Sequence, residues 1–423
     1  MPLSRETTGT SVPHRVIRPA EEADFPAFTR LGREAMLSVL DPEAAIEHRR
    51  LVVELDRSLG MFDGPELVGT TAAYSLTMTM PGGPRPVAGV TAVGVSPAHR
   101  RTGVVGALLR RQLRDIRELG RESVAALWAT EGGIYGRFGY GAASGKGAVR
   151  LHRGEGALRP DVPQNPALRL RTGAAAEFTA EIAAVHERCA MRRVGEFRRD
   201  DRWWRFLMHD PAGARDGFSP RRCALVEDGG GPLGYALYRV KQQWDDFGNA
   251  DGRLAVSEVA VSDPAARVLL WRHVLDRDLV ATVDIESLPL DDALYHLLAD
   301  RYRARTRVHD SLWIRLVDLP RAMAERSYAA PVDLVLEVRD TDCPWNQGRW
   351  RLTAGAGEAR CDATGEAPDL RLDVSHLGSA YLGAARVGAM AAAGMVEEAT
   401  EGAAARLDAA MGASVLPFTS VIF

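Results

Sequence analysis

Two adjacent arginines and two glycines stand where a predicted strand gives way to a predicted helix, in the stretch GVTAVGVSPAHRRTGVVGALL. These residues are Arg100, Arg101, Gly103 and Gly106. A helix N-terminus offers unpaired backbone N–H groups in the positive field of the helix dipole, and glycine lets a ligand approach the backbone closely. Arginine adds charge-assisted hydrogen bonds to phosphate oxygens. The spacing is neither a Walker loop nor a dinucleotide fingerprint. It predicts a loop that binds a phosphate-bearing anion, with a basic helix cap that binds nothing as the alternative.

A tyrosine follows this loop by about thirty residues, in the stretch EGGIYGRFGYG, where it is Tyr135. A phenol has an ordinary pKa near ~10, so it stays protonated at neutral pH and can donate a proton to a leaving group. A core tyrosine whose hydroxyl is merely satisfied is the alternative. Taken alone, this tyrosine favours that alternative, and only the family resemblance described below favours the catalytic interpretation.

The elements that must position these residues alternate between strands and helices. Residues 67–80 and 87–95 are predicted as strands joined by a turn rich in Pro and Gly. Residues 103–120 have the apolar stripe of an amphipathic helix, and residues 123–130 form another apolar strand. This alternation predicts an α/β layer with a partly parallel sheet.

A second copy of this pattern follows a Pro- and Gly-rich linker at residues 154–170. VSEVAVSDPAARVLLWRHVL, residues 256–275, resembles VTAVGVSPAHRRTGVVGALLRRQL, residues 90–113, but lacks the Arg-Arg-Thr-Gly insert. We interpret it as a duplicated fold that has lost its loop. A coincidental similarity between two strand–helix units is the alternative.

The last third of the chain changes character. Residues 332–373 contain short segments in which apolar and polar residues alternate, which is typical of antiparallel strands. Two Ala-rich segments, 379–394 and 401–412, are predicted as short helices. The chain ends in SVLPFTSVIF, residues 414–423, which is apolar up to the terminal carboxylate. Chain ends are commonly polar and frayed, so this composition favours a packed end.

Composition limits the class of protein. A chain of 423 residues with 46% hydrophobic content requires two or three domains, and a net charge of −3 argues against nucleic-acid binding. The four cysteines are far apart and show no CxxC spacing, so no metal site is expected. The start of the chain lacks the apolar core of a signal peptide, and no apolar run approaches the ~20 residues that span a bilayer. We therefore expect a cytoplasmic protein that does not contact a membrane.

The arginine loop resembles the acyl-CoA pyrophosphate loop of the GNAT superfamily of acetyltransferases, V-x-V-x-P-x-x-R-R-x-G-x-x-G. The matching residues are Val93, Val95, Pro97, Arg100, Arg101, Gly103 and Gly106. Over nearly its whole length the chain resembles the Eis (enhanced intracellular survival) family, in ATEGGIYGRFGYG, HDSLWIRLVDLPRAMAERSYA and DLRLDVSHLGSAYLGAAR. This resemblance implies an α/β (α+β) fold with a catalytic GNAT domain at 1–155, a degenerate GNAT-like domain at 156–305 and a sterol-carrier-protein-like domain at 306–423. It also implies assembly into a homohexamer.

The resemblance implies acetyl-CoA as the co-substrate and no metal. Its pantetheine arm would bind along Val93, Gly94 and Val95, and Thr130 and Glu131 would border the same molecule. Tyr135 would be the general acid that protonates the CoA thiolate. The diphosphate would be held by Arg100, Arg101, Thr102, Gly103, Val104, Val105 and Gly106.

The general base is not on the strand before the loop, because residues 88–95 contain no Asp, Glu or His. The resemblance implies that the carboxylate of the last residue, Phe423, takes this role. Such a carboxylate is a weak base in water, and burial strengthens it. In the alternative, Phe423 merely packs and the base is Glu131, His99 or a water chain.

Together these features predict an acetyl-CoA-dependent N-acetyltransferase of primary amines on small polycationic acceptors such as aminoglycosides. Ala92 and Ile422 stand where family members that favour aminoglycosides tend to carry an aromatic and an acidic residue, which weakens that choice of acceptor. Lysine side chains of peptides or proteins are the alternative acceptors. A further alternative is a non-catalytic protein that binds acyl-CoA or lipid.

Overall fold

The computed structural model describes residues 15–37, 42–355 and 357–423. The chain forms two compact units. Of the described residues, the first comprises 15–37, 42–74 and 91–112, and the second comprises 75–90, 113–355 and 357–423.

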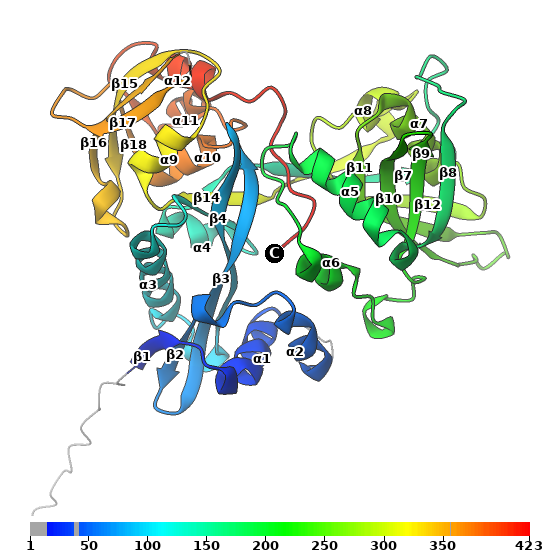
Figure 1. The fold of residues 1–423 in the computed structure, drawn as a ribbon, viewed down its shortest axis with the longest axis horizontal. Coiled ribbons are helices and arrows are strands. Elements are labelled where there is room, and N and C mark those ends of the chain that lie inside the picture. Colours follow the sequence, from blue (N-terminus) through cyan, green and yellow to red (C-terminus); the bar gives the residue numbers. More distant parts are fainter. Residues whose placement is uncertain (1–14, 38–41, 356) are drawn as a thin grey trace, which may run out of the picture. The chain divides into compact units, whose positions relative to one another are not determined.

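Figure 1 labels most of the strands and helices. The strands are β1 (Arg15–Pro19), β2 (Ser58–Asp63), β3 (Glu66–Met80), β4 (Gly83–Val95), β5 (Val124–Trp128), β6 (Gly141–Ala142), β7 (Gly145–His152), β8 (Arg169–Ala174), β9 (Arg222–Asp228), β10 (Gly231–Lys241), β11 (Gly252–Val261), β12 (Val280–Leu288), β13 (Arg305–Asp310), β14 (Leu312–Leu316), β15 (Val332–Arg339), β16 (Gly348–Ala354), β17 (Ala359–Ala363), β18 (Leu370–Asp373) and β19 (Glu397–Glu398). The helices are α1 (Phe25–Ala35), α2 (Pro42–Arg50), α3 (Val104–Leu119), α4 (Gly132–Tyr135), α5 (Thr179–Ala190), α6 (Asp201–Met208), α7 (Pro264–Leu275), α8 (Leu294–Leu297), α9 (Leu319–Glu325), α10 (Val374–Ala380), α11 (Val387–Ala392) and α12 (Ala403–Met411).

The first unit is built on β1, β2 and the start of β3, which pair antiparallel. Val104 and Leu108 of α3 pack on Val68 of β3 in one apolar cluster. Phe28 of α1 packs with Ala72 of β3 in a separate cluster. The helix predicted at 103–120 and the strands predicted on either side of the Pro/Gly turn are therefore confirmed, and Gly120 ends α3 with a left-handed φ of 64°.

In the second unit, β5 pairs with β4 along one edge and with β14, which is distant in the sequence, along the other. The β4 residues Ala88 and Gly89 pair in parallel with β5, and β14 pairs antiparallel with the other edge of β5. Meanwhile β7 lies between β12 and β13 in the next sheet. β7, which precedes the predicted boundary at 155, belongs to the sheet of β12, and β14, which follows the predicted boundary between 305 and 306, belongs to the sheet of β5. The domain boundaries stay a prediction.

The second sheet has the order β13-β7-β12-β11-β10-β9-β8 and is covered on both faces. Successive strand residues point to opposite faces, so Ala224 and Val226 of β9 pack with Trp271 of α7, whereas Cys223 and Leu225 pack with the residues of α5. Helices α5 and α7 flank this sheet in Figure 1. The strand–turn–helix of β11 and α7 follows the predicted second copy, and Asp263 caps α7 by accepting a hydrogen bond from the Ala266 N–H at 2.8 Å.

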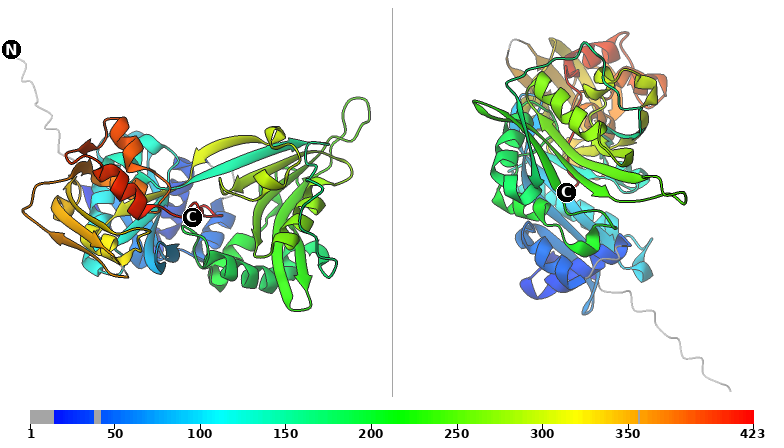
Figure 2. Two further views of the ribbon diagram at one scale, coloured as in Figure 1. Left: turned by 90° about the horizontal axis from the view of Figure 1, so that it is seen from above. Right: turned by 90° about the vertical axis from the view of Figure 1, so that its right-hand side faces the viewer.

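The third sheet has the order β17-β16-β15-β18-β19. Its pairs are antiparallel as predicted, except that β15 and β18 pair in parallel; the β16–β17 hairpin lies in the connection between these two strands. The first predicted Ala-rich helix is divided into the end of α10 and α11, and the second is α12. Beyond α12 the chain leaves this domain, and the red tail can be followed to the marked C-terminus in Figure 2. No helix among the described residues is long and apolar enough to cross a bilayer.

Candidate active site

The arginine loop lies in the first unit, between β4 and α3. A short turn at Pro97–His99 leads into Arg100 and Arg101, and both arginines are exposed. Arg101 has a left-handed φ of 62° and Gly103 one of 86°. A left-handed arginine is strained, and such strain persists where the surrounding structure requires it, often at ligand sites.

Hydrogen bonds within the first unit hold this loop in place. The Thr102 hydroxyl donates to the His99 carbonyl at 2.7 Å and accepts from Arg15 Nη1 at 2.8 Å. The Ala107 N–H donates to Gly103 O at 3.0 Å. The amides before Ala107 belong to the first turn of α3, whose N–H groups have no partner within the helix. No atom of the described residues lies within 4 Å of the position that a Gly103 Cβ would occupy, so the described part of the chain leaves this helix end open. The residues present fit a diphosphate.

The strand that enters the loop has an irregular backbone. Ala92 has a φ of 50°, and its carbonyl accepts a hydrogen bond from the Thr70 hydroxyl at 2.8 Å. Beyond this break, Gly94 is buried. The position that a Gly94 Cβ would occupy lies 3.2 Å from side-chain atoms of Leu31 and Ala35 of α1. A break in a strand frees backbone groups that a regular ladder would use. The residues predicted for the pantetheine arm, Val93 to Val95, follow this break directly.

Tyr135 ends the short helix α4 in the second unit. Its side chain is 7% exposed and meets the Tyr140 ring edge-on, with centroids 6.1 Å apart. Burial, and to a smaller extent the charge of Glu131, raises the pKa of the Tyr135 phenol above its ordinary value of 10. The turn that follows depends on Gly139, whose φ is 77° and whose Cβ would lie 2.8 Å from the buried Arg315 guanidinium carbon. Thr130 and Glu131 are exposed where β5 ends.

The chain end also lies in the second unit. Phe423 is half-buried, and its ring meets Phe197 edge-on with centroids 5.8 Å apart. On another side, the Phe423 ring lies 3.2 Å from the position that a Cβ on Gly89 of β4 would occupy. Pro417, Phe418 and Thr419 are buried. The apolar tail is therefore packed, as its composition favours.

The sequence did not identify the residues that hold this tail. Phe197, Glu196 and Arg199 precede α6 in the second domain, and Glu196 and Arg199 bond to Ser420. No local pattern marks these residues, because their partners lie more than 200 positions away in the chain. The pairing of the tail with this segment is visible only in the folded chain.

In the second copy, the described residues form no comparable arginine loop. Glu258 on β11 takes the sequence position of Ala92, and its carboxylate pairs with the buried Arg199 guanidinium at 3.0 Å. Tyr235 also donates to Glu258, at 2.7 Å. After β11 only Ser262 and Asp263 precede α7. Buried side chains and a short connection thus stand where the first copy has its strand break and arginine loop.

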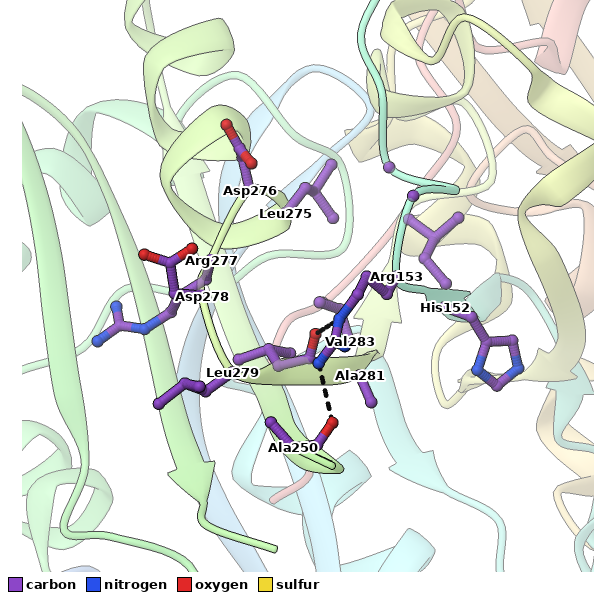
Figure 3. Close-up of a pocket in the computed structure, with 14 residues that line it drawn as sticks. His152, Arg153, Ala250, Leu275, Asp276, Arg277, Asp278, Leu279, Ala281 and Val283 are labelled. Atoms are coloured by element: carbon purple, nitrogen blue, oxygen red, sulfur yellow. Dashed lines mark hydrogen bonds between the residues drawn. The ribbon is translucent and has the colours of Figure 1, made fainter. Parts of the chain in front are cut away.

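A cavity of about 720 Å³ lies in the second sheet's domain, where α7 ends and β12 begins (Figure 3). Arg153 is its central cation, but its guanidinium donates to the backbone carbonyls of Val280 and Ala250, at 3.2 and 2.9 Å. Asp276 and Asp278 add the opposite charge to the lining. None of the predicted site residues lines this cavity. Among the described residues, no group of three or more His, Cys, Asp or Glu is placed to bind a metal ion.

Comparisons with known proteins agree with this architecture. Residues 16–143 and 195–316 each match an acetyltransferase (GNAT) domain family, and residues 319–420 match a sterol carrier protein domain family. The predicted order of two GNAT domains and a sterol-carrier-like domain is confirmed.

Similar proteins extend over most of the chain. An uncharacterized N-acetyltransferase of Streptomyces avermitilis is 41% identical over 88% of this chain and 92% of its own. The N-acetyltransferase Eis of Mycobacterium tuberculosis is 35% identical over 93% of this chain and 96% of its own. The crystal structure of Eis1 from Mycobacterium abscessus aligns with a TM-score of 0.81 at 33% identity, covering 96% of this chain and all of that one.

Proposed function

The chain belongs to the Eis family of N-acetyltransferases, and from this premise we propose that it transfers the acetyl group of acetyl-CoA to primary amines of small polycationic acceptors. The chain is an acetyltransferase with two GNAT domains. GNAT enzymes use acetyl-CoA, so the proposal concerns the residues that bind it, the acid, the base and the acceptor.

The arginine loop is proposed to bind the CoA diphosphate. The guanidinium groups of Arg100 and Arg101 are exposed beside the open end of α3, where the helix dipole favours an anion. Val93 to Val95 would bind the pantetheine arm with backbone groups, and Thr130 and Glu131 would lie beside the same molecule.

The reaction requires one proton to leave the amine and one to reach the sulfur. The amine nitrogen attacks the thioester carbonyl, the new C–N bond forms and the C–S bond breaks. We assign the first proton to the terminal carboxylate of Phe423 as general base, and the second to the CoA thiolate from the Tyr135 hydroxyl as general acid. One observation carries this proposal: the last residue is not free in solvent but packs between Phe197 and Gly89.

The acceptor class is taken from the family resemblance and has limited support from the rings near the chain end. Phe197 meets Trp203 edge-on at 5.1 Å, and Trp203 meets Phe206 at 5.7 Å. Phe197 is fully buried and Trp203 is 5% exposed, so of these three rings only the half-buried Phe206 is within reach of an ammonium group, which aromatic faces attract. Ile422 is 62% exposed and brings no charge next to the terminal carboxylate. We therefore propose small polyamines and aminoglycosides as one class, with aminoglycosides as the weaker members.

The test is a thiol-release assay with acetyl-CoA and a panel of amines: a kanamycin-type aminoglycoside, a linear polyamine, free lysine and a lysine-containing peptide. We expect CoA release with the first two and little with the peptide. Release with the peptide alone would favour lysine side chains on proteins as the acceptors. No release with any amine would favour a protein that only binds acyl-CoA.

The homohexamer remains a prediction from the family. Sedimentation equilibrium tests it, with an expected mass of roughly six times the 45.9 kDa of one chain. A stable monomer or dimer at micromolar concentration would contradict it.

A further inference from the structure

The segment between α5 and α6 lies between the end of β3 and the C-terminal tail. On one side, the Gly195 N–H donates to Thr79 O and the Thr79 N–H donates to Glu196 O, both at 2.8 Å. On the other side, the Phe418 N–H donates to Val194 O at 2.8 Å. In Figure 1 the red tail runs beside this green segment before the marked chain end. Backbone hydrogen bonds therefore join the tail to residues 194–196, and the same residues to β3.

The Glu196 carboxylate reaches from this segment into the tail. It accepts hydrogen bonds from the Ser420 N–H at 3.0 Å, the Ser420 hydroxyl at 2.7 Å and the Thr419 hydroxyl at 3.4 Å. A fourth bond comes from the Phe197 N–H at 3.1 Å. Glu196 is 6% exposed and Thr419 is fully buried. A buried carboxylate needs this many donors, because an unsatisfied one would cost several kcal/mol.

Arg199 completes the contact with the tail. Its guanidinium donates to the Ser420 hydroxyl, so that one hydroxyl accepts from Arg199 and donates to Glu196. Arg199 is itself held by Glu258 at 3.0 Å. We call Glu196, Arg199, Thr419 and Ser420 the tail clamp.

The charges around Glu196 keep it ionised. Burial raises the pKa of its carboxyl group, but His186, Arg199 and the Ser420 hydroxyl outweigh burial and lower the pKa to about 2. The carboxylate is therefore a hydrogen-bond acceptor throughout the neutral range. It can hold the tail at any pH at which the enzyme would be assayed.

We propose that Glu196 is the positioning residue for the terminal carboxylate, because by holding Thr419 and Ser420 it fixes where Phe423 ends. This inference rests on the proposed function, in which that carboxylate is the general base. Only Val421 and Ile422 lie between Ser420 and Phe423, so the Cα atoms of Ser420 and Phe423 are at most roughly 10 Å apart. The next residue after Glu196, Phe197, holds the Phe423 ring as well. On this account the degenerate GNAT domain contributes to catalysis by aligning a base that belongs to another part of the chain.

The test compares Glu196→Gln, Ser420→Ala and the control Glu187→Gln in the full-length protein. Glu187 is a half-exposed carboxylate on α5 that pairs with Arg198 at 2.8 Å, outside the tail clamp. We expect Glu196→Gln to lower kcat at least about ten-fold, since small misplacements of a catalytic group are costly, while KM for acetyl-CoA stays unchanged. Ser420→Ala should act in the same direction, and Glu187→Gln should match the wild type. Hydrogen exchange should accelerate in residues 417–423 of Glu196→Gln and Ser420→Ala only.

A double variant separates positioning from general stability. In a chain lacking Phe423, Glu196→Gln should cause no further loss of kcat, because the group that it aligns is already gone. An additional loss of the same size in that background would overturn the proposal. So would wild-type kcat in both Glu196→Gln and Ser420→Ala, provided that deletion of Phe423 abolishes turnover. Full turnover after deletion of Phe423 would instead overturn the proposed base, so the two failures are distinguishable.

Discussion

The ring of Phe423 lies edge-on to the ring of Phe197, with the two planes at 83°. Edge-to-face pairs contribute ~0.5–1.5 kcal/mol beyond simple burial. The contact joins the last residue of the chain to the second GNAT domain, and Gly89 of β4 bounds the same ring on another side. The Phe423 ring is therefore held by residues from distant parts of the sequence.

Deletion of Phe423 should remove most of the turnover. The new carboxylate on Ile422 would sit one residue short and without the ring that anchors it, so we expect a loss of about 100-fold or more in kcat, the usual contribution of a general base. KM for acetyl-CoA should not change. Steady-state kinetics with a polyamine acceptor measures both. Phe423→Leu, which keeps the carboxylate in register, is the control and should lose far less.

Tyr135→Phe should lower kcat by about 100-fold without a change in acceptor KM, because only the leaving thiolate needs the phenol proton.

The raised pKa of Tyr135 gives a pH prediction. A general acid works while protonated, so activity should fall only as pH rises through a value above 10. Glu131→Gln, which removes a charge that raises this pKa, should move the fall to lower pH. A fall near pH 8 that Glu131→Gln leaves unmoved would contradict the assignment.

Tyr140→Phe is the matched control for Tyr135→Phe, because the Tyr140 ring packs against the Tyr135 ring. The Tyr140 hydroxyl is buried and has no hydrogen-bond partner within the described part of the chain. Its removal should therefore leave kcat near the wild-type value and should not lower the melting temperature.

Arg101→Ala should raise KM for acetyl-CoA about ten-fold to a hundred-fold, the effect expected from one lost charge-assisted hydrogen bond. The same variant should show no defect with acetyl-pantetheine, which lacks the diphosphate. Initial rates with the two acetyl donors make the comparison. An equal loss with both donors would mean that Arg101 shapes the loop rather than binds phosphate.

Local patterns in the sequence were enough to predict β3, β4, α3 and β5. The Pro/Gly turn, the apolar stripe of α3 and the terminal Gly120 each determine the backbone conformation of nearby residues only. Their structural effect can therefore be predicted from the local sequence. The strand–helix echo at β11 and α7 is of the same kind.

Other features depend on contacts between distant segments. No local sequence pattern indicates that β14 pairs with β5, or that β7 belongs to the second sheet. Likewise, Glu196 looks like one charge in the polar run EFRRDD, and only its bonds to Thr419 and Ser420 reveal what it holds. Hydrophobic periodicity predicts which face of an element is buried but not which partner covers it.

Gly141→Ala should destabilise the contact between β6 and the sterol-carrier-like domain. A Cβ on Gly141 would lie 1.9 Å from the Ser375 carbonyl oxygen and 2.3 Å from the Ser379 nitrogen, both backbone atoms of α10. Backbone atoms of a helix cannot rotate away as a side chain can, so α10 or β6 must shift, at a cost of at least ~1–3 kcal/mol. Gly213→Ala, where nothing lies within 4 Å of the new methyl group, is the control. Urea unfolding should show a lower midpoint for Gly141→Ala alone, and equal midpoints for the two variants would mean that α10 moves freely against β6.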